Sequence, residues 1–145
     1  MTTRTGMLLG LSGVIVGLVA VGFVSHTPLR HVIQISPAVL ALAAAARRAP
    51  WARFAALPVC VFWLLIMVGI WLFLLGLARI ITGHYSAAEV LLTILIGVSS
   101  LVGGGASLRS IVPTGWRGAL AAGVGFALLQ VGAMWLSLQP AFATS

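Results

Sequence analysis

Glu89 is the only acidic residue in the chain, so it is the first candidate for chemistry. A carboxylate in a membrane helix often marks a proton or ion path. The spacing around it indicates another role, because Ser86 lies three positions earlier and an apolar run follows, which is the pattern of a capping box. The negative charge would also lie at the positive end of the helix dipole. We therefore interpret Ser86 and Glu89 as structural residues, with an ion path as the alternative.

Histidine is the other residue type here that is able to bind a cofactor. The chain has three histidines, His26, His31 and His84. Three imidazoles can hold a transition metal, and two can ligate a haem. Their spacing matches no recognised site, and the sequence has neither a second acid nor a second cysteine to complete one. We expect interfacial histidines, no metal, no cofactor and a colourless protein, with the three histidines as the candidate positions for a haem or quinone.

The charge balance and the missing motifs exclude several classes of protein. The formal net charge is +7, from eight arginines and one acid. In a soluble protein this balance would suggest nucleic-acid binding. Here the arginines lie at the ends of apolar runs, a placement typical of membrane topology signals, so we expect no nucleic-acid partner. A single carboxylate excludes two-carboxylate hydrolysis. Because the sequence also lacks a phosphate-binding loop and a cysteine pair, we expect no enzymatic activity.

Most of the chain consists of apolar stretches long enough to cross a bilayer. Of its 145 residues, 61% are hydrophobic and 6% are charged. A spanning helix needs about 20 mainly apolar residues. Five such stretches are present, at about 7–25, 28–48, 55–78, 87–108 and 119–138. We predict an all-α polytopic transmembrane helix bundle of five spans, forming a single integral membrane domain over residues 1–145. We expect membrane lipids around it and a location in the bacterial inner (cytoplasmic) membrane.

The second stretch has two possible assignments, because Gln34, Ser36 and Pro37 interrupt its apolar run. The Thr-Pro pair before it is a favourable helix start, with threonine as the N-cap and proline in the first turn. A full span is our prediction, and a half-helix that begins at Ser36, leaving four spans, is the alternative. The first stretch also matches a signal peptide, but its length favours a retained helix.

Small residues at helical spacing predict close contacts between helices. Gly13 and Gly17 form a GxxxG pattern, which lets two helix backbones approach in lipid. The fifth stretch repeats this small-xxx-small spacing with Ala119, Gly123 and Ala127. We interpret the pattern as packing inside one chain, with a homo-oligomer or a partner subunit as the alternative. Leucine at Gly13 or Gly17 should therefore be costly, and leucine at Val14 or Val16 should be better tolerated.

These patterns favour a protein that works through its helices. Our leading hypothesis is a structural or accessory membrane subunit without enzymatic activity, with a membrane-protein partner or a second copy. A small transporter or channel is the second hypothesis. Gln34, the Ser36-Pro37 pair, Thr93 and the glycine-rich end of the fourth stretch are suited to line a polar cavity. A haem or quinone carrier that uses the histidines is the third. We expect Trp63 and Trp71 to be lipid-facing or packing residues rather than a ligand platform.

The distribution of the arginines predicts the orientation of the chain. Five spans place one group of arginines on one side of the membrane, namely Arg4, Arg47, Arg48, Arg53, Arg109 and Arg117. Arg30 and Arg79 then lie on the other side. Because the arginine-rich side is usually cytoplasmic, we expect a cytoplasmic N-terminus and an extracytoplasmic C-terminus. Reporter fusions at both ends measure this. An extracytoplasmic N-terminus would contradict five spans, and a cytoplasmic C-terminus would contradict four spans as well.

Overall fold

Each apolar stretch forms one long helix, because a helix satisfies its backbone hydrogen bonds internally where no water is present. The computed structural model describes residues 2–111 and 113–143. Its helices are α1 (Thr3–Val24), α2 (Pro28–Ala46), α3 (Ala52–Leu74), α4 (Ala87–Arg109), α5 (Trp116–Ser137) and the short α6 (Pro140–Ala143). The first five are long and apolar enough to cross a membrane, and the described residues contain no strand. The predicted all-α membrane bundle is confirmed.

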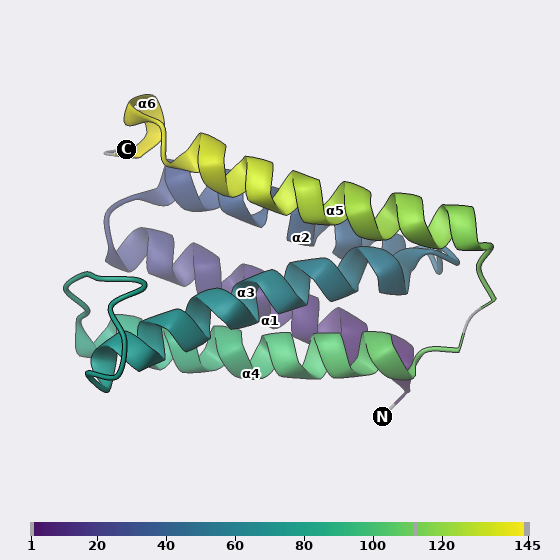
Figure 1. The fold of residues 1–145 in the computed structure, drawn as a ribbon, viewed down its shortest axis with the longest axis horizontal. Coiled ribbons are helices and arrows are strands. Elements are labelled where there is room, and N and C mark those ends of the chain that lie inside the picture. The colour runs from purple at the N-terminus through teal and green to yellow at the C-terminus, as the bar shows by residue number, and fades with distance from the viewer. Residues whose placement is uncertain (1, 112, 144–145) are drawn as a thin grey trace.

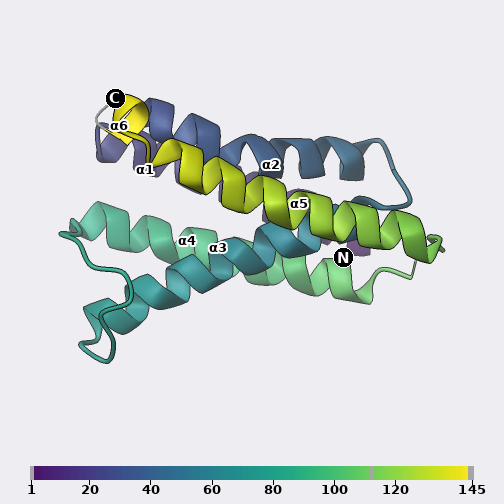
Figure 2. The same ribbon diagram turned by 45° about the horizontal axis from the view of Figure 1, so that its top comes forward.

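Successive helices run antiparallel, so the two chain termini lie at opposite ends of the bundle (Figure 1). The arginine-rich end holds the N-terminus and the connections from α2 to α3 and from α4 to α5. The opposite end holds the α1–α2 connection, the connector 75–86 and α6. α3 contacts all four other long helices, whereas α2 and α4 make no contact within the described residues. α1 packs most extensively against α4, and the two converge toward the arginine-rich end (Figures 1 and 2).

α2 continues through Pro37 because the polar groups around the proline find partners. Proline has no N–H, so the carbonyl of Ile33, four residues earlier, lacks its usual helical donor. The hydroxyl of Ser36 donates to that carbonyl at 2.8 Å. The Gln34 amide donates to the hydroxyl of Ser137 on α5 at 2.9 Å. The residues that interrupted the apolar pattern therefore stabilise a full-length α2, and the half-helix alternative is wrong.

α3 ends at Leu74, before the predicted boundary at 78, because the backbone turns into the left-handed region there. Gly76 has a φ of 72°, and the N–H of Leu77 donates to the carbonyl of Leu72 at 2.9 Å. This is the hydrogen bond of a Schellman motif, which satisfies a carbonyl at the end of a helix. His26 takes the equivalent position after α1, with a φ of 56°. The early end of α3 lengthens the connector to residues 75–86, which cross the opposite end of the bundle.

Two arginines stabilise helix ends at the arginine-rich end. The guanidinium of Arg4 donates to the carbonyls of Ala45 and Ala46 at 3.3 and 2.9 Å, at the end of α2. Arg53 donates to the carbonyl of Ser110, directly after α4. The last carbonyls of a helix lack intrahelical donors and carry partial negative charge. These arginines therefore hold neighbouring helices together as well as marking one side of the bundle.

A line of glycines on α1, which we call the glycine seam, brings α1 against α4. It consists of Gly10, Gly13 and Gly17. A Cβ atom at Gly10 would lie 2.7 Å from the carbonyl oxygen of Ser99, and one at Gly17 would lie 2.5 Å from Cγ1 of Ile96. A Cβ atom at Gly13 would meet the side chain of Ser99. The predicted GxxxG contact therefore lies within one chain, with α4 as its partner.

We expect Gly13→Leu and Gly17→Leu to lower thermal stability, because a side chain there forces α1 and α4 apart. Overpacking of this kind costs about 1–3 kcal/mol. Val16→Leu is the matched control, because Val16 is 60% exposed. Val14 cannot serve as a second control, since it is fully buried, which corrects the expectation that it would tolerate leucine. Thermal unfolding in mild detergent measures the effect, and an equal loss in Val16→Leu would show that the seam has no special role.

Candidate binding cavity

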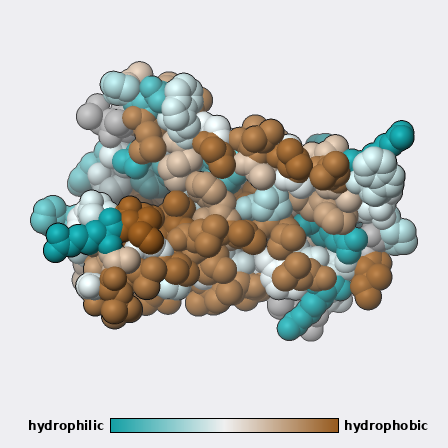
Figure 3. Space-filling view, in the orientation of Figure 1, coloured by the Kyte–Doolittle hydropathy of each residue, from teal (hydrophilic) through white to brown (hydrophobic). Residues whose placement is uncertain are grey.

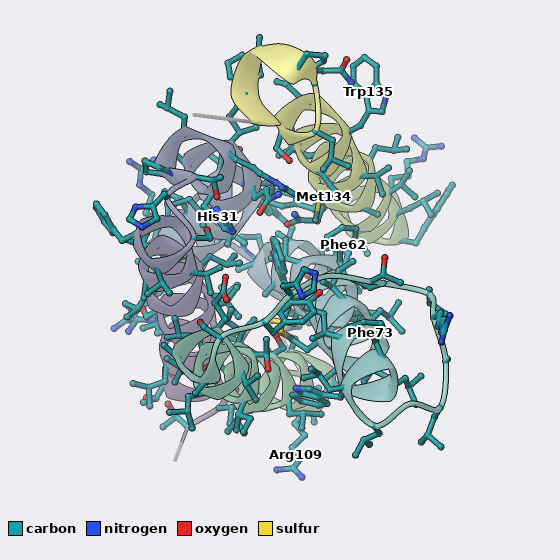
Figure 4. The ribbon with its side chains drawn as sticks, turned by 90° about the vertical axis from the view of Figure 1, so that its left-hand side faces the viewer. His31, Phe62, Phe73, Arg109, Met134 and Trp135 are labelled. Carbon is teal, nitrogen blue, oxygen red and sulfur yellow. The ribbon has the colours of Figure 1, made fainter. Side chains whose placement is uncertain are left out.

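A cavity of about 640 Å³ lies between the helices at the opposite end of the bundle. All five long helices and the connector 75–86 contribute to its lining. Figure 4 views this end along the bundle. There Met134 of α5 lies on the inner side of its helix and lines the cavity, whereas the neighbouring Trp135 points away and is mostly exposed. The cavity therefore occupies the interior of the bundle where α1 and α4 have separated.

Charged and titratable side chains collect on the part of the lining near the helix ends. Arg30 comes from the first turn of α2, His84 and Tyr85 come from the connector, and Glu89 comes from the first turn of α4. α2 and α4 are not packed against each other within the described residues, so Arg30 and Glu89 come from non-adjacent helices of the cavity wall. The described residues contain no ion pair between them. The single acid and this arginine thus face one cavity without neutralising each other.

The deeper lining is mainly apolar, and two polar residues there are already hydrogen-bonded. Gln34 donates to Ser137, as described above. The Thr93 hydroxyl accepts from the indole N–H of Trp71 at 2.9 Å and donates to the carbonyl of Val90 at 2.7 Å. Both residues line the cavity, as the transporter hypothesis expected. Their hydrogen bonds hold α2 to α5 and α3 to α4, which fixes the positions of the surrounding helices.

Two buried donors of lining residues have no hydrogen-bond partner. Trp63 is only 2% exposed, and its indole N–H has none. The Nε of Arg30 is buried and has none either. A buried donor without an acceptor costs about 1–3 kcal/mol. Because it is buried, Trp63 does not face lipid. Sequence reasoning missed its place on the cavity, because a tryptophan inside an apolar run gives no sign of which helix face it occupies.

The structure brings only two of the three histidines together. His31 and His84 line the cavity, whereas His26 is exposed and does not. The Nδ1 of His31 lies 3.0 Å from the carbonyl oxygen of Thr27, which can only accept, so Nδ1 carries the proton in this contact. Within residues 2–111 and 113–143, no three His, Cys, Asp or Glu side chains are grouped to hold a metal ion. A haem or quinone role would rest on His31 and His84 alone.

Glu89 takes part in a capping box at the start of α4. Its Oε2 accepts from the backbone N–H and from the hydroxyl of Ser86, both at 2.8 Å, and its own N–H donates to the Ser86 hydroxyl oxygen at 3.3 Å. Burial and, to a smaller extent, the Glu89 charge raise the pKa of Tyr85. The phenol therefore stays protonated and remains a hydrogen-bond donor on the lining at neutral pH.

α5 carries a second concave surface, which we call the α5 groove. It has a volume of about 460 Å³ and is lined by Leu40, Trp51, Gly118, Ala121, Ala122, Gly125, Phe126 and Leu129. A Cβ atom at Gly123, one of the predicted small residues, would lie at van der Waals distance from the carbonyl oxygen of Phe54 on α3. Cβ atoms at two further glycines, Gly125 and Gly132, would meet open space. Figure 3 shows apolar side chains along most of one face of the bundle, with hydrophilic ones mainly toward the ends.

No protein-family model matches this chain, and neither do the curated proteins or the solved structures with which it was compared. Its candidate site is therefore described by geometry alone.

We expect Glu89→Gln to leave stability nearly unchanged, because glutamine keeps a hydrogen-bonding group at the third helical position. Ser86→Ala should cost about 0.5–2 kcal/mol, because it removes the N-cap acceptor. Thermal unfolding of both variants beside the native chain measures the difference. If the Glu89→Gln protein folded normally but lost a proton- or ion-transport activity, the ion-path alternative would replace the structural interpretation.

Proposed function

We propose that this chain is a non-enzymatic integral membrane protein that binds one small, mainly apolar molecule in the cavity between its helices. Small-molecule sites have volumes of about 300–1,000 Å³ and mainly apolar linings with a few polar groups. The cavity, at about 640 Å³, has a lining of this kind. The observation that carries the proposal is the cavity itself, whose lining includes Trp63, a residue with a buried indole N–H that has no acceptor.

The hydrogen bonds of the lining support binding rather than catalysis. Acid–base catalysis needs a group that is free to exchange a proton with a substrate at hydrogen-bond distance. The only carboxylate here is bonded twice to Ser86 through one oxygen. The Nδ1 of His31 is bonded to a backbone carbonyl. Among the buried donors of the lining, those of Arg30 and Trp63 have no partner, which suits recognition of an acceptor.

The packing at the arginine-rich end favours a one-sided binding site over a channel. The glycine-rich end of α4, which the transporter hypothesis assigned to a polar cavity, packs against other helices instead. A Cβ atom at Gly103 would lie 2.9 Å from Sγ of Cys60 and 3.3 Å from Cα of Gly10. With the arginine-rich end in the cytoplasm of a bacterial cell, as the arginine distribution suggests, the cavity would face the extracytoplasmic side.

An accessory-subunit role is a second candidate, and the α5 groove favours it. Gly125 and Gly132 face open space on a helix that is otherwise apolar. Small residues on a lipid-facing helix allow the backbone of another helix to approach. The occupant would be a transmembrane helix of a partner protein. Purification in mild detergent, with identification of the co-eluting proteins, is the experiment for this candidate.

Filling the cavity should weaken ligand binding. In phosphatidylcholine nanodiscs, we expect dodecanol that carries a photoreactive diazirine to label cavity residues such as Met67 and Ile96. Ile66→Trp should reduce this labelling several-fold, because Ile66 lines the cavity and the larger ring occupies its volume. Leu65→Trp is the matched control, because Leu65 is 65% exposed on the same helix. Mass spectrometry locates and quantifies the labelled residues.

The proposed function fails if the probe labels only lipid-facing residues, or if Ile66→Trp and Leu65→Trp label cavity residues equally. Thermal unfolding of both variants establishes that they are folded before labelling is compared.

A further inference from the structure

We propose that the ligand is a single-chain amphiphile with an anionic head, bound by Arg30, and an oxygen acceptor near the far end of its chain, bound by Trp63. This inference rests on the proposed function, because it names the chemistry of the molecule that the cavity binds. Two unpartnered donors and the mainly apolar lining around them carry it.

Arg30 selects an anion because its charge is partly buried and has no counter-ion. Its Nε is buried without a hydrogen-bond partner, and the described residues contain no ion pair to it. It lies in the first turn of α2, at the positive end of that helix dipole. The N-cap Thr27 makes no side-chain cap bond to α2, since its hydroxyl contacts the hydroxyl of Ser25 at 2.8 Å. The arginine and the uncapped helix start both favour a negative group, and guanidinium binds carboxylate and phosphate well.

Glu89, the acidic residue of the cavity lining, does not reverse the preference for an anionic ligand. The two hydrogen bonds from Ser86 and the positive end of α4 already stabilise the charge of Glu89. The charge of Arg30 is stabilised neither by a hydrogen bond nor by the helix dipole at its position. His31 and His84, the other titratable side chains near the helix ends apart from Tyr85, add no negative charge. The lining carries one formal charge of each sign, but only Arg30 lacks hydrogen-bond partners, so the region around it favours an anionic head over a cationic one.

The interior fits one chain that carries an acceptor at depth. At about 1.5 Å per residue, Trp63 lies roughly 16 Å along α3 from the end of that helix. Because α3 ends at the same end of the bundle where α2 begins, Trp63 is far from the first turn of α2 (Figure 1). Apolar residues such as Leu18, Met67 and Ile96 also line the cavity. An anionic head held at Arg30 would leave the indole N–H of Trp63 without an acceptor, which an oxygen on the ligand's chain would supply. A ketone or ether oxygen supplies one without adding a second charge.

Competition against the photoreactive dodecanol in nanodiscs tests the head group. The competitors are dodecanoate, dodecanol and dodecylamine, compared at equal concentrations in the bilayer. We expect dodecanoate to compete best and dodecylamine worst. Arg30→Gln should weaken dodecanoate roughly ten- to hundredfold, because it removes a hydrogen bond to a charged group, which is stronger than one between neutral groups. Arg79→Gln is the matched control, because Arg79 is an exposed arginine of the connector that does not line the cavity.

A fourth competitor, dodecanoate with a ketone next to its terminal methyl group, tests the acceptor. We expect it to compete a few-fold better than dodecanoate, as one neutral hydrogen bond allows. Trp63→Phe should remove this advantage and leave plain dodecanoate unchanged. The reverse pattern is expected for Arg30→Gln, which should keep the ketone advantage.

Equal competition by dodecanoate and dodecanol would overturn the anionic head, as would equal effects of Arg30→Gln and Arg79→Gln. A ketone advantage that survives Trp63→Phe would overturn the acceptor. In these cases labelling of Met67 and Ile96 still supports the binding function. Absence of that labelling in the native chain overturns the binding function and this inference together.

Discussion

The close approach of α1 and α4 is the contact that shapes the rest of the bundle. In lipid, apolar burial gives helices little reason to associate, so packing at short range has to hold them together. The glycine seam permits such packing near the arginine-rich end, where Gly10 faces backbone atoms of α4. Farther along, Gly17 meets the side chain of Ile96. The two helices diverge beyond this point, and Ile96 itself lines the cavity.

Hydrogen bonds between polar side chains then fix the helices around the cavity, where α1 and α4 have diverged. Gln34 and Ser137 join α2 to α5, and Trp71 and Thr93 join α3 to α4. Each pair satisfies groups that would otherwise be unpaired in a low-dielectric interior, where leaving them without partners is costly. The ordering that results explains how a cavity of about 640 Å³ persists in a bundle of only five long helices.

The two ends of the bundle use arginine differently. At one end, Arg4 and Arg53 donate to carbonyls where α2 and α4 finish, so their charges meet the negative ends of helix dipoles. At the other end, Arg30 lies at the positive start of α2 and its side chain makes no hydrogen bond within the described residues, whereas Arg53, whose Nε also lacks an acceptor, bonds a carbonyl through another guanidinium nitrogen. This contrast separates arginines that stabilise the fold from the one that is available to a ligand.

Local chemistry in the sequence was sufficient for the number of spans and for the cap formed by Ser86 and Glu89, because both depend on residues near each other in the chain. It was not sufficient for the faces of the helices. In a soluble protein the polar face identifies the solvent side, but in a membrane both the lipid side and the packed side are apolar. The burial of Trp63, the difference between Val14 and Val16, and the place of His31 and His84 on one cavity therefore depended on the tertiary structure, which alone decides which apolar face another helix covers.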